Sequence, residues 1–114
     1  MLNQNLVVQD IWSLLTINKT NTNVISYGRA VKIGKLISIQ GRIHTKGVGV
    51  DYFTVDDSIK PPHWIVGWMM PYTTAKTFTE IACAYLNPSG VFQSDNILPV
   101  GGGYNFNITY MLNW

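Results

Sequence analysis

The chain has 114 residues, of which 46% are hydrophobic and only 12% are charged, against the share of about 25% that is usual in globular proteins. Its eight basic and six acidic residues are scattered singly and give a net charge of +2, so no basic stripe follows a phosphate backbone and nucleic acid is not expected as a partner. No apolar run approaches the roughly 20 residues of a membrane span, and the N-terminus lacks the pattern of a secretion signal, so we expect no membrane insertion.

The length allows one domain, which we divide into an N-terminal strand and polar loop over residues 1–26 and a β-sandwich core over residues 27–114. The single cysteine, Cys83, excludes an internal disulfide and a cysteine-built zinc site. It lies in the apolar run 81–86, where we expect it to act as a small buried hydrophobic residue.

The first half of the chain predicts strands and turns. Residues 6–17 are apolar enough for a short helix or a strand, and their β-branched side chains favour the strand. Residues 18–23, NKTNTN, predict a polar loop. Residues 27–43, YGRAVKIGKLISIQGRI, predict a β-hairpin whose turn residues are Gly34 and Lys35, with the glycine at the position where a type II′ turn needs a positive φ.

The second strand of this hairpin carries a polar face. Alternation places five polar residues on it: Ser38, Gln40, Arg42, His44 and Lys46. Such a face is commonly covered by solvent, but it could also meet a symmetry-related copy or an anionic glycan. His44 is therefore a candidate ligand-binding residue.

The middle of the chain alternates loops with short strands. Residues 45–50 predict a loop or a bulged edge, and residues 51–55 a strand. Two adjacent prolines require residues 56–63 to run as an exposed extended loop. Residues 64–70 then predict a strand with one face made of Trp64, Val66, Trp68 and Met70.

The last third of the chain follows the same plan. Residues 77–86 predict a strand, and Asn87 to Gly90 match the type I turn, so residues 91–93 should pair back as a hairpin. Residues 101–103 predict a flexible connector. In the closing segment 104–114 the aromatic and aliphatic residues alternate with Asn and Thr, which predicts one buried face. These short strands and turns predict an all-β fold, an antiparallel β-sandwich or a jelly-roll-like single domain.

A catalytic set is missing from the sequence. Asp56 and Asp57 are adjacent and would face opposite ways on a strand, Glu80 is alone, and the two histidines do not have metal-ligand spacing. We therefore expect no enzyme activity, no metal and no cofactor. A glycan-cleaving enzyme would need carboxylates that only folding brings together.

Aromatic residues beside neutral polar groups are present instead. A sugar ring offers an apolar face and a rim of hydroxyls, so its site combines a flat aromatic ring with hydrogen-bonding side chains. The candidate ligand-binding residues around the proline loop are His63, Trp64, Trp68, Tyr72 and Asp57. Each tryptophan could instead fill the core, an alternative that the high average burial of tryptophan favours.

The order of these features resembles the C-terminal β-domains of bacteriophage tail-fibre and baseplate proteins. The resemblance lies in YGRAVKIGKLISIQGRIHT, SIKPPHWIVGWMM, ACAYLNPSGVFQ and YNFNITYMLNW, which together cover most of residues 27–114. It implies a β-sandwich head domain that forms homotrimers, assembles with other phage tail proteins and binds saccharides of Gram-positive cell walls without cleaving them. The protein would be made in the bacterial cytoplasm and act in the virion. The stretch PPHW departs from the commoner Gly-aromatic-Arg-Pro pattern of these domains.

A homotrimer also fits the composition, because apolar residues on both faces of several strands need a partner to cover the second face. The alternative function is a structural tail, baseplate or fibre component without a ligand.

Overall fold

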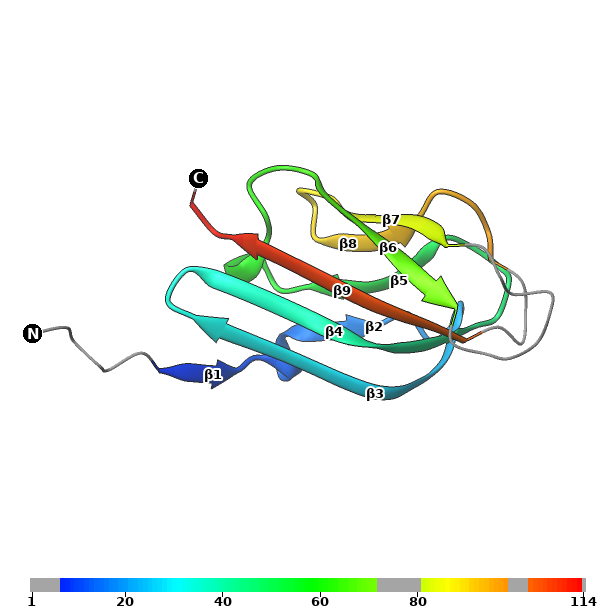
Figure 1. Ribbon diagram of the computed structural model, residues 1–114, viewed down its shortest axis with the longest axis horizontal. Coiled ribbons are helices and arrows are strands. Elements are labelled where there is room, and N and C mark those ends of the chain that lie inside the picture. Colours follow the sequence, from blue (N-terminus) through cyan, green and yellow to red (C-terminus); the bar gives the residue numbers. More distant parts are fainter. Residues whose placement is uncertain (1–6, 72–80, 99–102, 114) are drawn as a thin grey trace, which may run out of the picture.

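The computed structural model describes residues 7–71, 81–98 and 103–113, which form nine strands and two short 3-10 helices (Figure 1). In chain order the elements are β1 (Val8–Asp10), η1 (Trp12–Leu14), β2 (Leu15–Ile17), β3 (Thr22–Ile33), β4 (Leu36–Thr45), β5 (Asp51–Val55), η2 (Asp57–Ile59), β6 (Ile65–Pro71), β7 (Ala82–Leu86), β8 (Val91–Ser94) and β9 (Gly103–Met111). All pairs are antiparallel, in one curled sheet of order β1-β3-β4-β9-β6-β7-β8-β5-β2. The prediction of an all-β, antiparallel single domain is confirmed.

The predicted hairpin is β3 and β4, which are joined by the two residues Gly34 and Lys35. Gly34 has φ +60°, whereas no described residue other than glycine has a positive φ. A type I′ turn would need a positive φ at both central positions, so this combination is that of a type II′ turn. The turn prediction is confirmed.

The N-terminal segment is split between the two edges of the sheet. β1 pairs with β3 at one edge, β2 pairs with β5 at the other, and η1 turns the chain between them. The preference for a strand over residues 6–17 is confirmed for β1 and β2. It missed η1, the 3-10 helix that interrupts the strand. Residue 6 lies outside the described residues.

Asn21, directly before β3, is hydrogen-bonded to the backbone of the segment that leads into β5. Its Nδ2 donates to the carbonyls of Gly49 (2.9 Å) and Asp51 (3.0 Å), and its Oδ1 accepts from the amides of Val48 and Gly49. Next to it, the buried Thr22 donates its hydroxyl to the carbonyl of Tyr52. The predicted loop 18–23 is therefore two residues too long, because Thr22 already begins β3.

The segment 56–63 was predicted as an extended loop, which is wrong for its first half. The carboxylate of Asp56 accepts from the amide (3.0 Å) and the hydroxyl (2.6 Å) of Ser58 and so caps η2. Ile59, in η2, is buried, and its carbonyl accepts a hydrogen bond from the hydroxyl of Tyr110 on β9. The loop is therefore folded against the end of β9.

The predicted turn after β7 is confirmed. The amide of Gly90 donates to the carbonyl of Asn87 over 2.8 Å, and Gly90 has φ +89°. β7 and β8 pair on either side of it, from Leu86 with Phe92 onward. Residues 77–80 of the predicted strand lie outside the described residues, as do residues 101 and 102 of the predicted connector, whereas Gly103 already belongs to β9.

The core lies on the inner face of the curl. The predicted buried face of the closing strand is confirmed for Tyr104, Phe106, Ile108 and Tyr110. The ring of Phe106 lies 5.6 Å from that of Phe53 on β5 and 5.2 Å from that of Phe92 on β8, measured between centroids. Because β9 is separated from β8 and β5 in the strand order, these contacts show that the sheet curls back onto itself.

Candidate functional site

The outer face of the sheet is where side chains of β3, β4, β9 and β6 meet in rows. Residues that alternate with the buried ones point outward, and the strand register decides which of them are neighbours. One row runs from Tyr27 through Arg42 and Asn105 to Met70. The next contains Arg29, Gln40 and Asn107. Aromatic, cationic and amide side chains from β3, β4 and β9 are thereby placed side by side, with Met70 of β6 at the end of the first row.

A groove of about 560 Å³ crosses these rows. Its lining residues come from β3, β4 and β9: Tyr27, Gln40, Gly41, Arg42, Asn105, Phe106 and Asn107. Tyr27 is 53% exposed. The Nε of Arg42 donates to Oδ1 of Asn105 over 2.9 Å, which fixes the orientation of both planar groups.

A close approach of two strands shapes this groove. Gly41 pairs with Gly28, next to an irregularity in the register between Ile25 and Tyr27. A Cβ atom on Gly41 would lie 2.6 Å from the backbone oxygen of Tyr27 and 3.1 Å from the ring of Phe106. Only glycine leaves room for this approach, so Gly41 helps to set the position from which the Tyr27 side chain leaves β3.

The groove combines the two kinds of group that a carbohydrate needs. The exposed tyrosine ring offers a flat apolar surface, and the amide and guanidinium groups can exchange hydrogen bonds with neighbouring hydroxyls. None of the described groove residues is a carboxylate. The arrangement therefore suits recognition of a neutral or anionic polar ring.

An apolar strip lies beside the groove, on β6 and on Trp64 directly before it. Its four residues are exposed: Trp64 by 57%, Val66 by 73%, Trp68 by 61% and Met70 by 47%. Their predicted common face is confirmed, and the suggestion that Trp64 and Trp68 fill the core is wrong. The core is filled instead by the alternate residues Ile65 and Met69.

Cys83 belongs to the same outer face, so the expectation that it is buried is wrong. It is exposed and stands opposite Trp68 in the register of β6 and β7, whereas the next residue, Ala84, takes the buried position. Partial loss of hydration and the nearby Asp95 carboxylate raise the pKa of its thiol.

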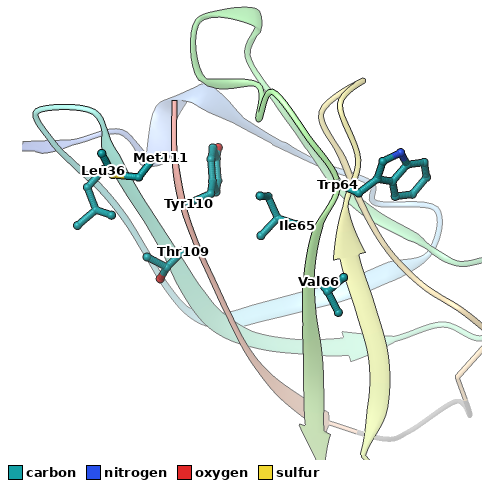
Figure 2. A pocket seen from close by; sticks show the side chains of 7 residues that line it. All are labelled: Leu36, Trp64, Ile65, Val66, Thr109, Tyr110 and Met111. Carbon is teal, nitrogen blue, oxygen red and sulfur yellow. The ribbon is translucent and has the colours of Figure 1, made fainter. Parts of the chain in front are cut away.

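A second, apolar cavity of about 370 Å³ lies between the ends of β6 and β9. Figure 2 shows Ile65 and Tyr110 on neighbouring strands, with Leu36 and Met111 close together at the left of the view. Burial raises the pKa of the Tyr110 hydroxyl, whose hydrogen bond to Ile59 holds η2 next to this cavity.

The predicted ligand-binding residues do not form one cluster. Trp64 and His63 are exposed and lie near the end of β9, on the side to which Tyr110 anchors η2. Asp57 is in η2, where its carboxylate pairs with the ammonium group of Lys60 over 2.7 Å. Trp68 is about 13 Å further along β6.

The remaining two predicted residues lie elsewhere. His44 is at the opposite end of β4 from Leu36, about 26 Å from the Trp64 cavity by strand length, so it cannot share a small ligand with Trp64. Tyr72 lies outside the described residues.

Tyr27, Asn105 and Asn107 were not predicted as parts of a site. Gln40 and Arg42 were predicted on a polar face, but that face was not connected with β9. The polar alternation of Asn105 and Asn107 was a usable signal, but only the pairing of β4 with β9 joins it to Arg42.

Within residues 7–71, 81–98 and 103–113, no three metal-binding side chains gather. No helix in these ranges has the length and apolar character that a membrane crossing requires.

Comparison with known proteins found no matching protein-family model, no matching curated protein and no matching solved structure.

Proposed function

We propose that this domain is a non-catalytic saccharide-binding module, and that the groove between β3, β4 and β9 is its sugar site. The observation that carries the proposal is the exposed ring of Tyr27 beside the hydrogen-bonded pair of Arg42 and Asn105. In this site a sugar ring stacks on Tyr27, and its hydroxyls bond to the planar side chains.

Groove geometry favours weak and selective binding. The Arg42–Asn105 bond restrains both side chains before a ligand arrives, which lowers the entropy lost on binding. Gln40 and Asn107 lie in the adjacent row and extend the polar surface along the sheet. A single ring bound on such an open face has low affinity, so function depends on several copies acting together.

The biological role that we propose is host adhesion by a phage virion. The sequence resemblance to tail-fibre and baseplate head domains supports it, and the all-β fold agrees with a head domain. Under this proposal the fold is sandwich-like or jelly-roll-like, and homotrimers present three grooves to host cell-wall saccharide while other tail proteins hold the assembly.

Binding without cleavage is part of the proposal. Of the described carboxylates, Asp56 caps η2 and Asp57 pairs with Lys60, and neither lines the groove. A purely structural tail component is the second candidate, which is favoured by the apolar strip on β6.

The test is a screen against purified Gram-positive cell-wall polysaccharides, followed by an NMR titration with the best binder. Tyr27→Ala and Asn107→Ala should each raise Kd about tenfold, because each removes one kind of contact. Asn96→Ala is the matched control for the second variant, since Asn96 is exposed and does not line the groove. Release of reducing sugar would contradict the non-catalytic proposal.

Trp64→Ala distinguishes this groove from the site that the sequence predicts beside the proline loop. If Trp64→Ala abolishes binding and Tyr27→Ala does not, the site lies at His63 and Trp64 and the groove proposal is wrong. Absence of binding to every polysaccharide would favour the structural role.

A further inference from the structure

The outer face of β6 and β7 carries a continuous apolar surface. Val66 and Trp68 stand opposite Tyr85 and Cys83 in the register, and the ring of Trp64 packs 5.1 Å from that of Tyr85. Ile81, directly before β7, is 57% exposed. The surface also continues onto the apolar cavity beside Leu36 and Met111.

We infer that a second copy of this chain covers this β6–β7 face, with Cys83 inside the contact. The inference rests on the self-association included in the proposed function and adds the surface through which it occurs. It does not depend on saccharide binding, since none of the groove residues belongs to β6 or β7.

The exposed area is of the size that an interface needs. The exposed parts of Trp64, Val66, Trp68, Met70 and Ile81 amount to roughly 600 Å², because a whole aromatic side chain carries about 150–250 Å². A standard interface buries about 800 Å² on each partner, of which about 65% is apolar in its core. The strip together with Ile81 therefore supplies the apolar part of one such interface, at the upper limit of about 600 Å² found on monomers.

The electrostatics of the face favour contact with its own copy. The strands β6 (IVGWMMP) and β7 (ACAYL) contain no charged residue, and Asp95 lies at their border beside Cys83. A charged patch would repel itself when equivalent surfaces meet around a symmetry axis, whereas this face does not. A strongly charged partner would find no opposite charge on these strands.

The contact is made by side chains and not by adding a strand. Both β6 and β7 lie inside the sheet and have a hydrogen-bonded neighbour on each side, so their backbones are already paired. A partner must therefore pack against the protruding indole of Trp68 and fill the cavity beside Leu36. The polar groove next to Met70 would stay at the rim of the interface, open to a ligand.

Cys83 provides a reporter that needs no mutation, because it is the only cysteine in the chain. Light scattering and alkylation of the thiol by N-ethylmaleimide at constant pH are measured from about 1 to 100 µM protein. Association should appear in the scattering, and the alkylation rate should fall at least about tenfold over the same range. A monomer at all concentrations, or an oligomer whose Cys83 reacts at a constant rate, would overturn the inference.

A matched pair of variants tests the location. Val66→Lys places a charge within the strip, and Val48→Lys places one at a comparably exposed valine in the loop after β4. Val66→Lys should weaken association by at least about a hundredfold, because a buried unpaired charge is costly, and Val48→Lys should leave it unchanged.

The pattern of failures separates this inference from the saccharide proposal. Equal association of the two variants would move the interface to another face and overturn the inference. The saccharide titration of Val66→Lys reports on the groove independently. Circular dichroism checks the fold of each variant, and the concentration dependence of wild-type alkylation decides the question if Val66→Lys does not fold.

Discussion

Gly41→Ala tests whether a close approach of two strands shapes the groove. Gly41 does not have a positive φ, so alanine meets no backbone strain there, and the effect is purely steric. The new Cβ would lie 2.6 Å from the backbone oxygen of Tyr27 and 3.1 Å from the ring of Phe106. Ordinary contact begins at 3.4 Å, so β3 and β4 must separate locally by roughly 0.8 Å.

The expected cost follows from two opposing contributions. Overpacking of this kind costs about 1–3 kcal/mol, and replacing glycine with alanine restricts the unfolded chain and returns about 0.5–1 kcal/mol. At the centre of these two ranges the free energy of unfolding should fall by about 1.3 kcal/mol. For a chain of this length that corresponds to a decrease in Tm of about 5 °C.

Urea titration and calorimetry measure the change, and Gly49→Ala is the control. At Gly49 the nearest atoms to a new Cβ belong to the Asn21 side chain, at 4.0 Å, so alanine should be neutral or slightly stabilising. Saccharide affinity should also fall in Gly41→Ala, because Tyr27 is displaced. A Gly41→Ala protein as stable as the wild type would refute the steric argument.

Two further predictions concern pH. Burial raises the pKa of Tyr110 above that of an unfolded tyrosine, so its contribution to stability is complete below about pH 10 and is lost as pH rises above that value. The free energy of unfolding of Tyr110→Phe should be about 1 kcal/mol lower than that of the wild type at pH 8, because the hydrogen bond to Ile59 is missing. In urea titrations its free energy of unfolding should also decline less as pH rises above about 10. An unchanged dependence on pH would contradict this. Hydrogen bonds from the Ser58 side chain and amide lower the pKa of Asp56, so its contribution is present above the unfolded pKa of about 3.9 and is lost as pH falls further. Ser58→Ala should be less stable than the wild type at pH 7, with a difference that shrinks in acid; a difference that is constant with pH in thermal melts would argue against this role of Asp56.

Turn residues and the alternation of side chains along each strand, both readable from the sequence, determined much of the fold. Glycine at position 34 selects the turn between β3 and β4, and Asn87 with Gly90 selects the turn between β7 and β8, because each turn depends on the φ values of a few consecutive residues. Alternation likewise predicted the buried face of β9 and the common face of Trp64 and Trp68, since side chains on a strand alternate whatever the strand pairs with.

Tertiary structure alone decided which face is the core and which strands are neighbours. Trp64 and Trp68 are apolar side chains of the kind that often fills a core, so the sequence does not show which face of β6 is buried. The curl of the sheet places Ile65 and Met69 on the inside. The candidate groove joins Tyr27 and Arg42 to Asn105, which is far along the chain and reaches them through the pairing of β4 with β9. Periodicity fixes the two sides of each strand, but strand order and curvature depend on long-range contacts, and these determine which side faces solvent.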